Sequence, residues 1–272
     1  MRKAEDKARI GPLGGWILSG CLCFFLLQPL LCFAQPKAEI RTPAPLNVAE
    51  AEKDGRALIA NLLAQKPEQD LTNRGMLTIR TEDNTRQIPV IFLVVATPTN
   101  WLTLYEAASG GPGGGPVTLT VVHSDAQPNQ YYLAPSAPVA ATNLFSGARL
   151  SAAQTMAPFA GSDFWIADLG LEFLHWPQQR LLRKEMHRSR SCNVLESVIP
   201  NPVPGGYARV VSWIDIETGG ILTAEAYDAR DRLLKQFATK KIEKVHGQWQ
   251  LEGMEIRNRQ TGSRTRIEFD LR

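Results

Sequence analysis

The sequence has few cysteines. Three of the four, Cys21, Cys23 and Cys32, lie in the first 34 residues, and the fourth is Cys192. A single remaining thiol cannot form an internal disulfide, so the stability of the domain must come from its core. Cys192 lies in a strand-like run, which favours a buried structural cysteine, with a nucleophilic thiol as the alternative.

The chain also lacks a surplus of either charge. Residues 1–34 contain four of the 30 Lys and Arg and two of the 27 Asp and Glu, which leaves a formal charge of +1 on the remainder. Proteins that bind nucleic acid usually carry a basic surplus or patch. The composition therefore predicts no nucleic-acid partner.

A phosphate-binding loop is absent as well. The glycine-rich stretch Ser109–Pro116 has neither the Gly-Lys-Ser/Thr ending nor the following helix that such a loop requires. We predict instead a mobile hairpin loop between two strands.

The first residues predict an export signal. A basic start is followed by an almost uncharged apolar run, Trp16–Phe33, and by small residues before Gln35. This pattern is typical of a signal peptide over residues 1–34 that is cleaved off. The alternatives are an uncleaved membrane helix and lipid attachment at Cys21, which follows Leu18-Ser-Gly. A proline-containing leader, residues 35–46, separates the signal from one predicted domain, residues 47–272.

The domain begins with a helical pattern and continues with strands. Asn47 can cap a helix that extends to about Gln65, which either packs on a sheet or covers the mouth of a cavity. From Asp70 onward the apolar residues alternate with polar ones, and turn signals follow at short intervals. The last strand is the clearest, since Thr265, Ile267 and Phe269 share one face. The pattern predicts an antiparallel meander that curls into a barrel or half-barrel.

One block interrupts the strands. In Phe159-Ala-Gly-Ser-Asp-Phe-Trp-Ile-Ala-Asp-Leu169, Ser162 or Asp163 can cap a short helix or turn. The block resembles the Phe-x-Gly-Ser-Asp-Phe-x-x-x-Asp-Leu signature of the outer membrane lipoprotein-sorting proteins, the LolA-like family. Ala224–Lys235 is similar to the family's Tyr-Asp-x-x-Gly-x-Leu-x-Lys hairpin, with Asp231 in place of the glycine. The resemblance extends over roughly residues 70–272, except for residues 97–150.

The resemblance implies a mainly β fold with some α-helix, in which a curved antiparallel sheet forms a half-barrel and helices cover its concave face. It implies a periplasmic, non-enzymatic carrier of lipid or of lipoprotein acyl chains that takes part in outer membrane lipoprotein sorting. The implied partners are the cargo, an inner-membrane ABC transporter and an outer-membrane acceptor, and no cofactor or metal is expected. The predicted cavity residues are Phe164, Trp165, Leu169, Phe173, Trp213 and Phe237.

Two other functions stay open at this stage. One is an envelope sensor or scaffold with the same fold. The other is a periplasmic hydrolase that uses Asp163, Asp168 and His175, although their spacing matches no metal motif. In the structural interpretation, Asp163 caps a turn, Asp168 bonds nearby backbone or pairs with an arginine, and His175 lies on the surface.

Overall fold

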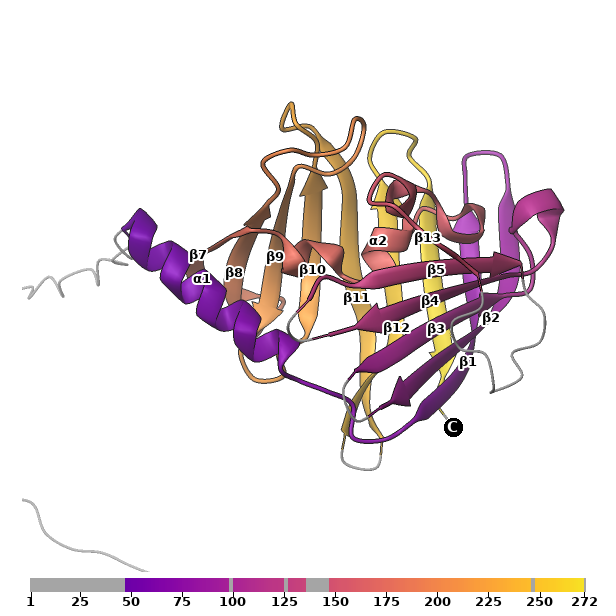
Figure 1. Cartoon of the computed structure of the whole chain (residues 1–272), viewed down its shortest axis with the longest axis horizontal. Helices are drawn as coiled ribbons and strands as arrows, with labels where there is room; N and C mark the ends of the chain where they lie inside the picture. Colours follow the sequence, from indigo (N-terminus) through magenta and orange to yellow (C-terminus); the bar gives the residue numbers. More distant parts are fainter. Residues whose placement is uncertain (1–46, 98–99, 125–126, 136–146, 246–247, 272) are drawn as a thin grey trace, which may run out of the picture. The chain divides into compact units, whose positions relative to one another are not determined.

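Thirteen antiparallel strands form one curved sheet that does not close on itself (Figure 1). This count applies to the residues that the computed structural model describes, which are 47–97, 100–124, 127–135, 147–245 and 248–271. The predicted signal peptide, Cys21 and the leader lie outside them. The mainly β fold class and the curved antiparallel sheet are therefore confirmed.

The sheet consists of two meanders. The strands of the first are β1 (Leu71–Arg80), β2 (Thr85–Ala96), β3 (Trp101–Ala107), β4 (Val117–His123), β5 (Gln130–Pro135) and β6 (Ala148–Arg149). Those of the second are β7 (Gln178–His187), β8 (Arg190–Val198), β9 (Arg209–Asp215), β10 (Ile221–Tyr227), β11 (Leu233–Val245), β12 (Gln248–Asn258) and β13 (Arg264–Asp270).

The two meanders meet where the first strand pairs with the last. The strand order is β6-β5-β4-β3-β2-β1-β13-β12-β11-β10-β9-β8-β7, and β1 lies antiparallel to β13 from Arg74 opposite Asp270 to Arg80 opposite Arg264. The pattern predicted for the last strand is confirmed, because Thr265, Ile267 and Phe269 are all buried. One face of the sheet is thus apolar and faces inward.

The segment that the family resemblance did not cover belongs to the same sheet. Residues 97–150 contain β3 to β6, and the glycine-rich stretch connects β3 to β4 as a hairpin with a short 3-10 turn, η1 (Pro112–Gly114). The predicted hairpin connection is confirmed. The predicted turn or helix at residues 143–146 lies outside the described residues.

Helix α1 (Val48–Leu63) packs on β7. Asn47 is its N-cap, and the Asn47 side chain accepts a hydrogen bond from the Ala49 amide at 3.1 Å, as predicted. A helical glycine normally destabilises a helix, but a Cβ atom on Gly55 would lie only 2.5 Å from the carbonyl oxygen of Gln179 in β7. Gly55 therefore allows the helix backbone to approach the strand closely.

A segment of short helices lies on the concave side of the sheet. We call it the plug: η3 (Phe159–Gly161), α2 (Ile166–Leu169) and η4 (Glu172–His175), preceded by η2 (Gln154–Met156). Figure 1 shows α2 within the curve of the sheet. The predicted short helix exists, but neither Ser162 nor Asp163 is its N-cap. Ser162 caps the turn before it, since Ser162 Oγ accepts a hydrogen bond from the Phe164 amide at 3.2 Å. Trp165 is the N-cap residue, and the Asp168 carboxylate accepts a hydrogen bond from the Trp165 amide at 2.7 Å.

The main core lies between the two meanders. Buried side chains from β1 to β5 and from β12 and β13 pack together around Phe159, Phe164, Ile166 and Leu169 of the plug. Cys192 is fully buried in β8, which confirms the structural interpretation of this thiol.

Candidate functional site

A cavity of about 570 Å³ lies inside the curve of the sheet. Its lining comes from β1 to β4, from the plug, from the end of α1 and from β10 to β13. The apolar side chains in it include Phe92, Val94, Phe164, Leu169, Phe237 and Met254. Pockets for small organic ligands commonly have volumes of about 300–1,000 Å³, so this cavity is large enough for such a ligand.

The lining includes two large apolar side chains that remain exposed. Leu171, directly after α2, is 38% exposed, and Trp249 at the start of β12 is 49% exposed. Leu62, in the last turn of α1, lines the same cavity. Helix α1 thus packs on the sheet and also reaches the cavity, so the two interpretations of this helix are compatible.

The predicted cavity residues separate into three groups. Phe164, Leu169 and Phe237 line the large cavity. Phe173 lines a neighbouring void of about 40 Å³, which also includes Phe237 in its wall. Trp165 and Trp213 line neither space.

Trp165 contributes instead to an aromatic stack beside the plug. Its ring lies 4.4 Å from the ring of Tyr207, and the Lys235 ammonium lies 3.7 Å from its centroid. The positive charge over the ring face is a cation–π contact. Trp165 therefore helps to hold Lys235.

Trp213 lies in β9 on the face of the sheet opposite the cavity. Its indole Nε1 donates a hydrogen bond to Glu185 Oε1 at 2.5 Å, and its ring stacks on His187. Its neighbours along β9, Ser212 and Ile214, are buried on the inward face.

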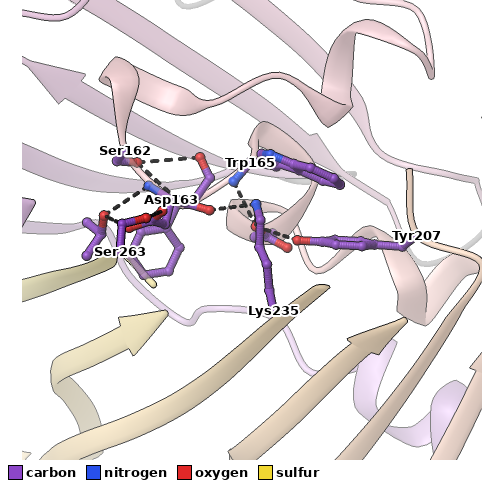
Figure 2. Close-up of polar contacts among 9 residues, drawn as sticks. Ser162, Asp163, Trp165, Tyr207, Lys235 and Ser263 are labelled. Atoms are coloured by element: carbon purple, nitrogen blue, oxygen red, sulfur yellow. Dashed lines mark hydrogen bonds and ion pairs between the residues drawn. The ribbon is translucent and has the colours of Figure 1, made fainter. Parts of the chain in front are cut away.

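Polar side chains of the signature block fix the plug to the second meander (Figure 2). The Asp163 carboxylate accepts hydrogen bonds from Ser263 Oγ at 2.5 Å and from Thr265 Oγ1 at 2.8 Å. The Asp163 amide donates to Thr265 Oγ1 at 2.9 Å. The structure therefore corrects the expectation that Asp163 caps a turn, since its carboxylate joins two segments that are about 100 residues apart.

Lys235 in β11 forms the second connection to the plug. Its ammonium donates a hydrogen bond to the Asp163 carbonyl oxygen at 2.6 Å and lies 3.6 Å from Asp168 Oδ2 (Figure 2). Tyr207 OH donates to the same Asp168 oxygen at 3.2 Å. Asp168 thus bonds nearby backbone, as expected, but its cationic partner is a lysine and not an arginine.

Burial shifts the protonation equilibria of this cluster. It lowers the pKa of Lys235 to about 8, although Asp168 and Asp163 oppose that shift. It also raises the pKa of Asp168, against the opposing effect of Lys235. Both groups are held by short contacts to the fold, which favours a structural role for the cluster.

The three residues of the hydrolase hypothesis do not form a metal site. The carboxylates of Asp163 and Asp168 already accept hydrogen bonds from Ser263 and Tyr207. The described residues contain no group of three or more His, Cys, Asp or Glu side chains suited to a metal ion. His175 is half-buried and not on the surface as expected, and burial lowers its pKa.

The sequence prediction missed polar residues on the cavity wall formed by the first meander. Thr103 Oγ1 lies 2.9 Å from His123 Nε2, and Tyr105 OH donates to the Leu169 carbonyl oxygen at 3.3 Å. Burial lowers the pKa of His123 to about 4, so this imidazole is neutral at pH 7. Asn73 in β1 also lines the cavity. The signal for such residues is a polar side chain at an inward-facing position of a strand, and it can be recognised only when the face of the strand is known.

Comparisons with known proteins agree with this architecture. A family model that describes an uncharacterized protein matches residues 116–271, more than half of the chain. No curated protein matches the sequence. No helix in the described part of the chain is long and apolar enough to span a membrane.

Three solved structures are similar over most of the chain. A DUF1329 family protein from Desulfovibrio piger is 20% identical, with a TM-score of 0.65 over 81% of this chain and 92% of the other. A putative outer membrane lipoprotein-sorting protein domain from Vibrio parahaemolyticus is 19% identical, with a TM-score of 0.66 over 80% and 91%. A LolA superfamily protein from Nitrosomonas europaea is 14% identical, with a TM-score of 0.53 over 81% and 91%. At these identities the likeness establishes the fold.

Proposed function

The chain belongs to the family of uncharacterized proteins matched over residues 116–271 and has the LolA-like fold, and from this premise we propose that it is a non-enzymatic carrier of acyl chains. The cargo is lipid or the acylated end of a lipoprotein. The place of action is the periplasm, and the process is the sorting of lipoproteins to the outer membrane.

The cavity is the observation that carries this proposal. Each CH₂ group moved from water into an apolar space contributes about 0.8 kcal/mol. A cavity of about 570 Å³ with aliphatic and aromatic walls can therefore bind an acyl chain tightly without a covalent step. Exposed apolar side chains in its lining, Leu171 and Trp249, offer a route by which such a chain enters.

The polar signature residues support a carrier over an enzyme. Asp163, Asp168 and Lys235 bond the plug to the sheet, so their functional groups already have partners. The chemistry of a carrier needs only an apolar wall and a plug that can adjust to the cargo.

Transport also requires partners. The predicted signal peptide supports a location outside the cytoplasm, and the names of two similar structures refer to lipoprotein sorting or to LolA. We propose an inner-membrane ABC transporter as the source of cargo and an outer-membrane acceptor as its destination.

Native mass spectrometry of the mature protein purified from its own periplasm tests the proposal. We expect a co-purified phospholipid or acylated peptide that organic extraction releases. Cargo of the acylated-peptide type supports lipoprotein sorting, whereas a single signalling lipid would favour a sensor. An empty protein that also fails to take up a fluorescent acyl probe would refute acyl binding.

Two residues proposed from the sequence provide a matched pair of variants. Phe237 lies in the cavity wall, whereas Trp213 lies on the opposite face of the sheet. We expect Phe237→Lys to weaken binding of a fluorescent acyl probe at least tenfold, because a charge in an apolar wall is costly to desolvate. Trp213→Lys should bind the probe like the wild type, provided that circular dichroism shows both variants folded. Equal binding of the probe by the two folded variants would show that Phe237 does not contribute to the binding site.

A further inference from the structure

We propose that the Asn73 side chain is a hydrogen-bonding anchor for a neutral carbonyl group, an ester or an amide, on the acyl chain bound in the cavity. This inference rests on the proposed carrier function and specifies its ligand. It distinguishes cargo with an ester or amide linkage from plain hydrocarbon and from free fatty acid.

Asn73 has an unusual environment for a polar residue. It lies near the start of β1, opposite Phe92 in β2, and is only 6% exposed. The Asn73 side chain lines the large cavity, and among the described residues it has no hydrogen-bond partner. The amide nitrogen and oxygen of Asn73 are not completely inaccessible, so a ligand in the cavity can reach them. A buried amide without a partner is unfavourable, and most buried polar side chains in proteins are hydrogen-bonded.

The neighbouring polar groups on this wall already have partners. Thr103 and His123 bond each other, and Tyr105 OH bonds the backbone of Leu169. These three side chains come from β3 and β4, on the same inward face as Asn73. Thr103, His123 and Tyr105 are therefore engaged within the protein, whereas the Asn73 side chain retains donor and acceptor capacity for a ligand.

The immediate surroundings of Asn73 are apolar. Phe92 packs against Tyr105 and Phe269, with ring centroids 4.9 Å and 5.5 Å apart. A ligand group that meets Asn73 must therefore lie within an otherwise hydrophobic wall. An acyl chain satisfies this condition if it carries one polar group between apolar parts.

The chemistry of the amide selects a neutral group. A primary amide donates through its NH₂ group and accepts through its oxygen, so it can pair with the carbonyl oxygen of an ester, or with either the carbonyl oxygen or the N–H of an amide linkage. A carboxylate in the same place would need a cation. The described lining of the cavity contains no lysine or arginine, and its one histidine, His123, bonds Thr103. Esters and amides of fatty acids thus fit the site better than the free acids.

Competition with a bound fluorescent acyl probe tests this inference. The competitors are three compounds of matched chain length: methyl dodecanoate, N-methyldodecanamide and tetradecane. One hydrogen bond to Asn73 should make the mature wild-type protein bind the ester and the amide about three- to tenfold more tightly than a variant without the amide does. Asn73→Leu keeps the approximate volume but removes the amide, so relative to the wild type it should lose this factor of affinity for the ester and the amide and lose none for the alkane. Asn73→Ala provides a second variant in case the leucine side chain disturbs folding.

A control variant lies on the other face of the same strand. Thr72 is exposed and is absent from the cavity wall, so Thr72→Val should retain the wild-type preference. If Asn73→Leu binds the ester and the amide as tightly as the wild type does, the role of Asn73 is overturned and the carrier function is left intact. An equal loss for all three compounds would also overturn it. A wild-type protein that binds neither the probe nor any competitor would refute the carrier function itself.

Discussion

Removal of the Asp163 carboxylate is the sharpest test of how the plug is held. In the folded protein this carboxylate accepts two short hydrogen bonds, from Ser263 and Thr265, and Asp163 is only 8% exposed. Hydrogen bonds to a charged group contribute about 1.5–3 kcal/mol each. Asp163→Ala removes both and leaves two hydroxyl groups without their acceptor. We expect the free energy of unfolding to fall by about 3–5 kcal/mol, which for a domain of this size lowers Tm by roughly 10 °C.

Urea denaturation followed by circular dichroism measures this change. Asp163→Asn retains one acceptor oxygen in the same shape, so its loss should be about half as large. Thr265→Val removes a single hydroxyl, and its effect should not add to that of Asp163→Ala, because both variants break the same bond. A loss below about 1 kcal/mol in Asp163→Ala, or full additivity with Thr265→Val, would refute this account of the plug.

Two other predictions concern stability. Gly55→Ala should destabilise the protein by about 1–3 kcal/mol, because the new Cβ atom would clash with the backbone of Gln179 in β7. This loss is expected although alanine favours helices more than glycine does. A gain in stability, measured by urea denaturation, would contradict the close packing of α1 on β7. Burial lowers the pKa of Lys235 from 10.5 to about 8, so between these pH values the unfolded chain holds a proton that the folded protein has released. The free energy of unfolding of the wild type relative to Lys235→Met should therefore rise between about pH 8 and pH 10.5, and a flat or falling difference would contradict the burial of this amine.

Local patterns were sufficient to predict most of the elements. The alternation of Thr265, Ile267 and Phe269 predicted the inward face of β13, and Asn47 predicted the start of α1. The tight turn between β7 and β8 was not predicted, because Arg188 and Ser189 adopt positive φ in it. Such a turn depends on backbone conformations that these residue types rarely adopt, so composition did not reveal it.

The candidate site was harder to predict, because it depends on contacts between distant segments. The partners of Asp163 lie 100 and 102 residues away, and no local pattern identifies them. The face of each strand was also unknown, so Trp213 was grouped with Phe237 although the two side chains lie on opposite faces. Asn73 was overlooked because a single polar residue in a strand has no meaning until its face is known.

The pairing of β1 with β13 has a consequence for the folding kinetics. This pair joins the two meanders and brings together residues from Leu71–Arg80 and Arg264–Asp270, so a very long loop must close before the sheet becomes continuous. Each meander by itself needs only hairpin contacts, which form quickly, whereas closure of long loops slows folding. The walls of the cavity come from both meanders. A kinetic intermediate with two separate half-sheets would therefore lack a cavity, and the ability to hold an acyl chain would arise in the last step of folding.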